Sequence, residues 1–328
     1  VFCGLLLLVL LAITLVNNAN PIGFSKNALF QAKLPETVLE VQGDLVWAGD
    51  QSYYNYHDGS LKRINRSGKV LWEASLEGNL LWKGPEGVLV AQDNSLIMLD
   101  GSGAEIFRKV NMPDDLRVLW VQDKYLLLSG MLQGADYGIL LYGSGSTVWQ
   151  LPFEGNIISG SLHPKALFAV FNIIGNDAKQ RLQVVGPTGE TLWEGTFREP
   201  IYKIKALEEG ICAIAGDRAC LLDYDGRPKW EHEFSGQVLR GDIGDDGSFA
   251  AVIKDRAGNL SQNIQHILIM LSSQGKEICS YSLDAPVNIV YKDRDHVYLV
   301  DDDGIMVLSQ EGLLISNIKQ KGIKQLTV

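Results

Sequence analysis

The chain is poor in the residue types that usually carry catalysis or bind metals. Its 328 residues include only 4 Cys and 5 His, and no G-x-S-x-G motif is present. The histidines are scattered, one per region, whereas zinc sites place their Cys and His ligands at short fixed spacings. No His stands beside a Ser or Cys in a pattern typical of nucleophilic catalysis. The sequence therefore predicts a protein that is not an enzyme, with no catalytic residue, cofactor or metal ion.

Clustered positive charge is also missing. The chain has 29 Lys plus Arg against 39 Asp plus Glu, a net charge of −10, and no block of like charges. A nucleic-acid partner needs clustered Lys and Arg to meet its phosphates, so the composition argues against one. Two acid-rich segments, 242–247 and 293–304, do not follow the ligand order of a calcium loop and are typical of turns.

The first sixteen residues, VFCGLLLLVLLAITLV, form an unbroken apolar run. A membrane-spanning helix needs about 20 residues, and the apolar part of a signal peptide has about 7–15, so the run lies between the two. Asn17 and Ala19 make a poor cleavage site, which favours an uncleaved transmembrane anchor over a cleaved signal peptide. We expect residues 1–16 to anchor the chain, residues 17–27 to form a polar linker, and the rest to lie on the extracytoplasmic side.

A repeat of about 40 residues fills residues 28–328. A glycine follows a short polar turn in each copy, with an aliphatic residue four positions before it. The seven glycines are Gly68, Gly103, Gly145, Gly189, Gly226, Gly275 and Gly312. Four positions after the glycine, the first five copies carry an aromatic residue: Trp72, Phe107, Trp149, Trp193 and Trp230. The last two copies carry Cys279 and Ser316 there.

Each copy reads as a strand, a tight glycine turn and a second strand, with two further short β runs before them. Four strands, here A to D, at this period are typical of a propeller blade, and the aromatic residue would pack between neighbouring sheets. The sequence therefore predicts an all-β propeller of seven complete blades. Residues 28–34 resemble a lone D strand and residues 322–328 a lone A strand. Either they belong to an eighth blade of a longer chain, or seven blades close and they are extra strands.

Two copies, LLDYDGRPKW (221–230) and VVGPTGETLW (184–193), resemble the PQQ-like β-propeller repeat. That family includes quinone-dependent dehydrogenases, a scaffold lipoprotein of the outer-membrane barrel-assembly machine, and many anchored bacterial proteins. The resemblance implies a bacterial, membrane-anchored scaffold that binds a protein partner. Two alternatives stay open: a quinoprotein-like oxidoreductase or other enzyme using the central channel, and a cell-wall-binding or ligand-sensing propeller. The adjacent cysteine pair of the dehydrogenases is absent here.

The connections between B and C strands differ in length, whereas the C–D turns are uniform. Four segments, 51–59, 131–138, 172–181 and 255–265, are interpreted as long B–C loops. Variable loops on a rigid scaffold usually carry binding, so we expect the partner on this face. The predicted partner-binding residues are Tyr53, Tyr54, Tyr56, His57, Asn176, Asp177 and Arg256. The alternative is that the tyrosines are strand residues packed between blades.

Cys212 and Cys220 flank a predicted B–C hairpin centred near Gly216. At that spacing they would be cross-strand neighbours on one face, close enough for a disulfide in an oxidising compartment. Free buried thiols are the alternative.

Overall fold

The computed structural model describes residues 44–47, 52–57, 59–65, 67–76, 78–84, 87–122, 124–175, 177–255 and 266–319. The predicted anchor (1–16), the linker (17–27) and the lone strands 28–34 and 322–328 lie outside these residues. Within them, no helix is long and apolar enough to cross a membrane.

The described residues form 28 strands in seven four-stranded sheets, distributed over two compact units. The first unit, which contains the residues up to Asn111, holds β1 (Asp44–Trp47), β2 (Ser52–His57), β3 (Ser60–Asn65), β4 (Val70–Ser75), β5 (Asn79–Gly84), β6 (Gly87–Gln92), β7 (Ser95–Leu99) and β8 (Glu105–Val110).

The second unit begins at Met112 and holds five sheets. Their strands are β9 (Asp114–Gln122), β10 (Tyr125–Leu132), β11 (Ala135–Tyr142), β12 (Thr147–Phe153), β13 (Asn156–Leu162), β14 (Ala169–Ile174), β15 (Gln180–Val185), β16 (Thr191–Phe197), β17 (Ile201–Leu207), β18 (Gly210–Ala215), β19 (Arg218–Leu222), β20 (Pro228–Glu233), β21 (Gly236–Ile243), β22 (Phe249–Asp255), β23 (His266–Leu271), β24 (Glu277–Leu283), β25 (Ile289–Lys292), β26 (His296–Val300), β27 (Gly304–Ser309) and β28 (Leu314–Lys319).

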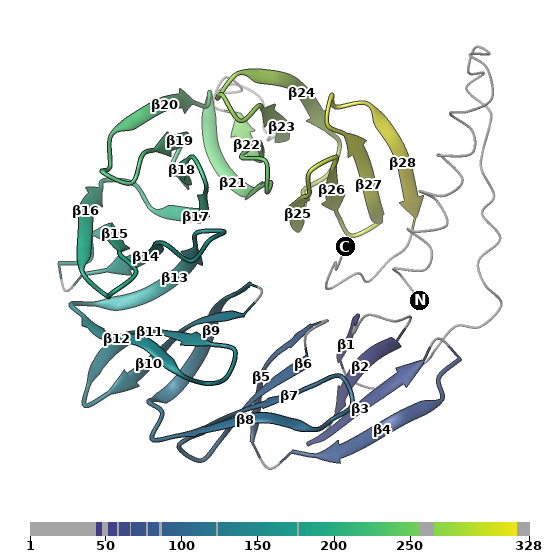
Figure 1. Cartoon of the computed structure of the whole chain (residues 1–328). Coiled ribbons are helices and arrows are strands. Elements are labelled where there is room, and N and C mark those ends of the chain that lie inside the picture. The colour runs from purple at the N-terminus through teal and green to yellow at the C-terminus, as the bar shows by residue number, and fades with distance from the viewer. Residues whose placement is uncertain are drawn as a thin grey trace. The chain divides into compact units, whose positions relative to one another are not determined.

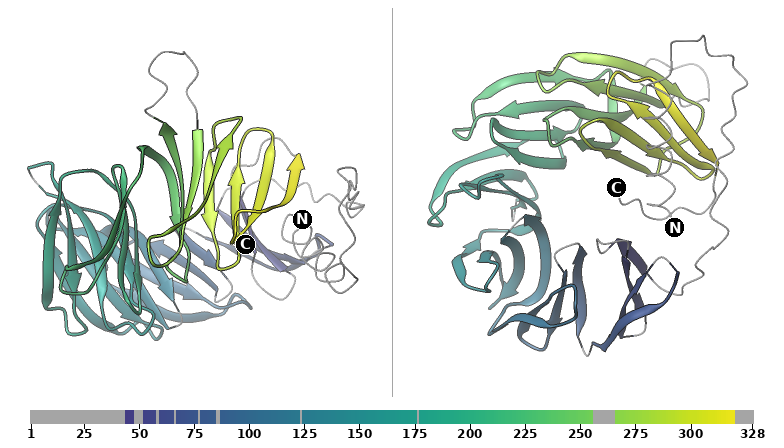
Figure 2. Two further views of the ribbon diagram at one scale, coloured as in Figure 1. Left: turned by 90° about the horizontal axis from the view of Figure 1, so that it is seen from above. Right: turned by 45° about the vertical axis from the view of Figure 1, so that its right-hand side comes forward.

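In every sheet the spatial order of the strands is their order in the chain, and all pairs are antiparallel. The predicted A, B, C and D strands are therefore confirmed, and seven such sheets fit a seven-bladed β-propeller. In the second unit, successive sheets stand side by side in an arc, with the A strands β13, β17, β21 and β25 on its concave side (Figures 1 and 2).

The C–D turns have the geometry that the glycine repeat predicts. All seven glycines have φ between 74° and 94°, a region that glycine enters at little cost. In the β19–β20 turn, Gly226 N–H donates to the Asp223 carbonyl (3.0 Å) and Asp223 N–H to the Arg227 carbonyl (2.8 Å). The same pair of bonds recurs in the other six turns. This is a tight hairpin closed by a glycine bulge, so a short sequence signal determines it.

The core lies between neighbouring sheets, and the middle strands are the most deeply buried. All six residues of β18 are buried, for example, because a sheet covers each of its faces. One apolar cluster joins β18 and β19 to the sheet β21–β24, and another joins them to β13–β16. The outer D strands instead alternate between exposed and half-buried residues, as in β20.

Four tryptophans of the repeat each pack against the next sheet of the same unit, as predicted. Trp72, Trp149, Trp193 and Trp230 each sit in a D strand opposite the C-strand residue that precedes a register shift. Each tryptophan lies against the turn glycine of the following sheet: Gly103, Gly189, Gly226 and Gly275 in that order. In the sixth copy Cys279 takes this place against Gly312. The repeat spacing thus reflects sheet-to-sheet packing and the hairpin together.

Candidate functional site

The prediction that residues 51–59 form a long B–C loop is wrong. Residues 52–57 are strand β2, and β3 already begins at Ser60. Tyr53 and Tyr54 are 4% and 0% exposed, and the Tyr54 ring lies 6.0 Å from that of Trp72. Tyr56 is half-buried against the same cluster, and His57, at the end of the strand, is exposed. Tyrosine favours both strands and binding surfaces, and here its ring fills the space between two sheets.

The other predicted loops give a mixed result. Residues 131–138 form the ends of β10 and β11, joined by the two-residue turn Gln133–Gly134, so they are not a long loop. Strand β14 ends at Ile174 and β15 begins only at Gln180, so the predicted B–C connection is longer here, and the exposed Asp177 pairs with Lys179 (3.2 Å). Asn176, Arg256 and residues 256–265 lie outside the described residues. A partner-binding role for Asp177 stays a prediction.

Of the two possibilities for Cys212 and Cys220, the structure has free thiols and no disulfide. Cys212 lies opposite Leu221, and Cys220 lies opposite Ala213. Neighbouring strand residues point to opposite faces, so the two thiols project from opposite sides of the sheet, each into a separate core cluster. Both are free, and burial raises the pKa of each thiol to about 12. The sequence pattern indicated a hairpin centred near Gly216, whereas the centre lies between Gly216 and Asp217. This shift of half a residue changes the cross-strand partners, so the two thiols lie on opposite faces.

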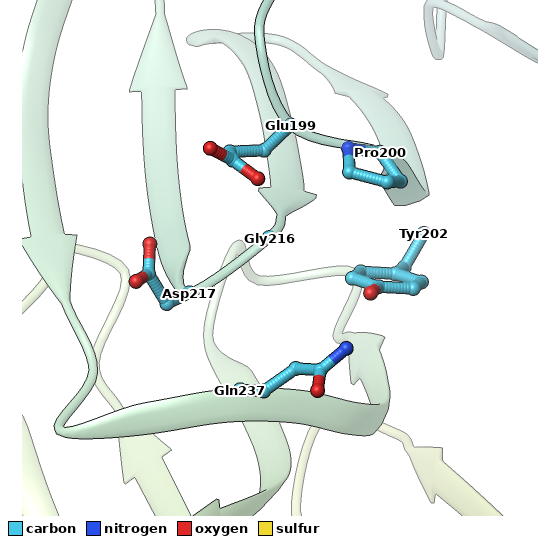
Figure 3. A pocket seen from close by; sticks show the side chains of 6 residues that line it. All are labelled: Glu199, Pro200, Tyr202, Gly216, Asp217 and Gln237. Carbon is cyan, nitrogen blue, oxygen red and sulfur yellow. The ribbon is translucent and has the colours of Figure 1, made fainter. Parts of the chain in front are cut away.

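The face predicted to bind a partner does contain a pocket, built from other residues. In the second unit, Glu199, Pro200, Tyr202, Gly216, Asp217 and Gln237 line a cavity of about 190 Å³ (Figure 3). Glu199 and Pro200 belong to the D–A link before β17, and Gly216 and Asp217 form the B–C turn between β18 and β19. The pocket therefore lies at the end of the sheets where D–A links and B–C turns meet.

Backbone hydrogen bonds hold these segments together. Gly216 N–H donates to the Pro200 carbonyl (2.9 Å), and Val238 N–H donates to the Gly216 carbonyl (3.3 Å). Gly216 has a φ of +59°, and a Cβ on it would lie 2.6 Å from Cβ of Glu199. Only glycine fits this turn without moving Glu199, so the turn and the link are positioned by each other.

Tyr202 reaches the pocket because of a bulge in β17. The register with β18 shifts between Ile201 and Lys203, which leaves Tyr202 without a cross-strand partner and its side chain 43% exposed. The A strands of four other sheets carry a bulge at the corresponding position, with Leu81, Leu119, Ile158 and Leu239 as the extra residues. Tyr202 is the one aromatic residue in this set.

Sequence reasoning missed Tyr202, although a signal was present. The D–A steps of the repeat align as NLLW, NIIS, PIYK and QVLR, and only PIYK has a tyrosine among aliphatic residues. A departure from a repeat at an exposed position is a usable sign of function. Glu199 and Asp217 carry no such signal, because acidic residues are common in turns.

The lining is negatively charged and partly aromatic. Figure 3 shows the Glu199 and Asp217 carboxylates on one side of the hollow, and the Tyr202 ring and the Gln237 amide on the other. The lining contains no nucleophile next to a base. Across the part of the chain that the structure describes, no three His, Cys, Asp or Glu side chains are placed to hold a metal ion.

No family model matches this sequence, and no curated protein matches it. Solved structures do resemble it. Sqt1 of Saccharomyces cerevisiae is 9% identical, with 82% of this chain and 83% of that one covered and a TM-score of 0.57. The dihydro-heme d1 dehydrogenase NirN in complex with DHE is 13% identical, with 88% and 66% covered and a TM-score of 0.57. The WD40 domain of SCAP from fission yeast is 10% identical, with 88% and 89% covered and a TM-score of 0.50.

These neighbours are β-propellers. At such low identity they support the fold and nothing finer, because propellers carry many unrelated functions. The PQQ-like repeat remains a resemblance of the sequence.

Proposed function

We propose that this chain is a non-enzymatic scaffold propeller, anchored in a bacterial cell membrane by residues 1–16, that binds a protein partner on its extracytoplasmic side. The apolar run at the start of the sequence supports the anchor. The propeller-like sheets supply a rigid scaffold, and the loops that connect the strands of such a scaffold usually carry the binding residues.

The pocket around Tyr202 is the observation that carries the proposal. Three segments distant in sequence meet there, and their backbones are bonded to one another. An exposed tyrosine beside polar groups is typical of interface positions, since it brings apolar area and a polar tip together. The partner site thus stays on the predicted face but moves from Tyr53 and Tyr54 to Tyr202.

The test is site-specific photo-crosslinking of the full chain in its native membrane. A photo-reactive residue in place of Gln237 is expected to capture the partner, and Tyr202→Ala in the same chain is expected to reduce that capture at least tenfold. The control probe replaces Gln274, an exposed residue in the β23–β24 turn at the opposite end of the sheets. Capture from position 274 but not from 237 would show that the assigned face is wrong.

The orientation has a separate test. A Gln274→Cys chain is expected to react with a membrane-impermeant maleimide in intact cells, and the unsubstituted chain serves as the control. Labelling that appears only after lysis would place the sheets in the cytoplasm and overturn this part of the proposal.

A further inference from the structure

The turn between β13 and β14, residues 163–168, begins with a buried histidine. His163 is 4% exposed, and it is the one buried histidine in the part of the chain that the structure describes. Its Nδ1 accepts the backbone N–H of Lys165 at 3.0 Å. In the β25–β26 turn, the residue that directly follows the A strand is Asp293, and its carboxylate accepts the N–H of Asp295 at 2.8 Å. One position of the fold thus carries a carboxylate in one turn and, in the other, an imidazole that titrates near neutral pH.

The imidazole of His163 also contacts the next sheet. Its ring lies edge-on to Phe168, with centroids 5.5 Å apart, and to Tyr224, with centroids 5.6 Å apart. Tyr224 belongs to the β19–β20 turn, stacks on Phe168 at 4.3 Å and donates its hydroxyl hydrogen to the Leu207 carbonyl. Phe168 and Tyr224 both pack against the apolar cluster between the two sheets. The histidine is therefore part of the contact by which the β13–β14 turn covers this cluster.

A proton on Nδ1 of His163 is incompatible with this arrangement. Nδ1 accepts the Lys165 N–H only while it carries no hydrogen, because both nitrogens of an imidazolium are donors. The same turn holds Ala166 at a φ of +53°, a left-handed conformation that residues with a Cβ adopt at a cost. Loss of the bond to His163 removes one of the contacts that keep this strained turn closed.

The charged groups near His163 do not offset its burial. Lys165 of its own turn and Glu208 of the β17–β18 turn pair with each other at 2.9 Å, and both are exposed. In the β19–β20 turn, the carboxylates of Asp223 and Asp225 interact with groups of that same turn. Burial lowers the pKa of His163 from its ordinary value of 6.5, against an opposite effect of the Glu208 charge.

We propose that His163 is a pH-sensitive contact between two sheets, and that protonation of its Nδ1 releases the 163–168 turn from Tyr224. This inference does not depend on the proposed function. The closed turn binds the proton more weakly than the open turn, so it is fully stable above pH 6.5 and weakens as the pH falls below that value. Each pH unit below 6.5 raises the ratio of open to closed turn by up to about tenfold.

Hydrogen exchange of the full chain in detergent, measured at pH 7.5 and 5.5 by mass spectrometry, tests the proposal. After correction for the intrinsic pH dependence of exchange, the protection of residues 163–168 is expected to fall between about threefold and tenfold at the lower pH. Strand β18, whose six residues are all buried, is expected to keep its protection. Equal losses in both segments would show that acid unfolds the whole unit, and would overturn the proposal.

Two variants assign the effect to one imidazole. His163→Asn retains an acceptor for the Lys165 N–H that does not titrate, and is expected to abolish the fall in protection. His232→Asn is the matched control, because His232 also has a ring contact, with Phe234 at 5.0 Å, but lies in β20. It is expected to leave the fall unchanged. A fall that persists in His163→Asn, or that disappears in His232→Asn, would overturn the proposal.

A titration of the unsubstituted chain gives an answer even if His163→Asn does not fold. The NMR signals of the His163 imidazole are identified by their contacts with the Phe168 ring. The midpoint is expected below pH 6.5, and the neutral ring is expected to carry its hydrogen on Nε2. A midpoint at or above 6.5, or a neutral ring with its hydrogen on Nδ1, would show that the bond to Lys165 does not resist protonation.

Discussion

Trp230 Nε1 donates a hydrogen bond to the Ser273 carbonyl, 2.9 Å away, and so joins strand β20 to the C–D turn of the next sheet. Trp72 makes the corresponding bond to the Gly101 carbonyl at 2.8 Å. In both cases the indole ring also lies against the glycine of that turn. The contact between tryptophan and glycine recurs at Trp149 and Trp193, whereas Nε1 of Trp149 has no hydrogen-bond partner. The tryptophan and the glycine therefore pack as one structural unit although they belong to successive copies of the repeat.

Replacement of Trp230 should separate the contribution of its hydrogen bond to stability from the contribution of its ring packing. Trp230→Phe removes the N–H but keeps an aromatic ring, so we expect a loss of about 1 kcal/mol in the free energy of unfolding. Trp230→Ala also removes the packing and should cost about 3 kcal/mol. Urea unfolding of the full chain in detergent measures both. Equal losses for the two variants would show that the ring contributes nothing beyond its hydrogen bond.

Two glycines with nearly the same φ offer a matched comparison. Gly226 (φ +80°) lies under Trp193, and a Cβ on it would be 1.9 Å from Cε2 of the indole; Gly134 (φ +81°) has no atom within 4 Å of such a Cβ. Gly134→Ala should therefore cost only the left-handed backbone, about 1 kcal/mol. Gly226→Ala should cost about 2 kcal/mol more, because the indole must move. Similar unfolding energies for both would contradict the packing of Trp193 on this turn.

Asp242 and Asp245 allow the contribution of a buried carboxylate to the free energy of unfolding to be compared with that of an exposed one. Asp242 is buried, pairs with Lys203 (2.8 Å) and accepts the N–H of Lys292 (2.9 Å), which joins three neighbouring A strands. Asp242→Ala should cost about 3 kcal/mol, because a buried N–H loses its acceptor. Asp245, 86% exposed, pairs with Lys205 at 2.6 Å, and Asp245→Ala should cost less than about 1 kcal/mol. Thermal or urea unfolding that ranks the two in the reverse order would refute this account.

The two buried thiols should be unreactive in the folded chain. Burial raises the pKa of Cys212 and Cys220 from 9 to about 12, so both are protonated at pH 8, and the thiolate is the reactive form. Maleimide labelling followed by mass spectrometry should modify them only after unfolding. A Cys212–Cys220 bridge after mild oxidation would contradict the register of β18 and β19.

The raised pKa values of these two thiols make the free energy of unfolding decrease at high pH. Because the folded pKa is the higher one, the folded state retains these protons after the unfolded state has lost them. The stabilisation is complete below pH 9 and falls as the pH rises from 9 towards 12. The measurement is the slope of the unfolding free energy against pH, which should be smaller in a Cys212→Ala, Cys220→Ala chain. An unchanged slope would show that other groups cause it.

Some features of this protein follow from local sequence. A glycine at a position with positive φ and an aromatic residue four positions later are requirements that few other residues meet, so the seven C–D hairpins and the packing positions of the tryptophans were predictable. The count of seven four-stranded sheets followed from the same repeat, because each copy is one antiparallel unit.

Other features depend on register and on contacts between distant segments. Tyrosine is common both in strands and at binding interfaces, so the sequence does not distinguish the two roles. Tyr53 and Tyr54 are buried because a neighbouring sheet packs against them. A shift of one residue reverses the face of a strand, which is why the sequence spacing of Cys212 and Cys220 did not reveal that they point apart. The pocket is the strongest case. Glu199, Gly216 and Gln237 come together only when a link, a turn and a strand from two sheets pack side by side, and the bulge that exposes Tyr202 exists only in the paired strands.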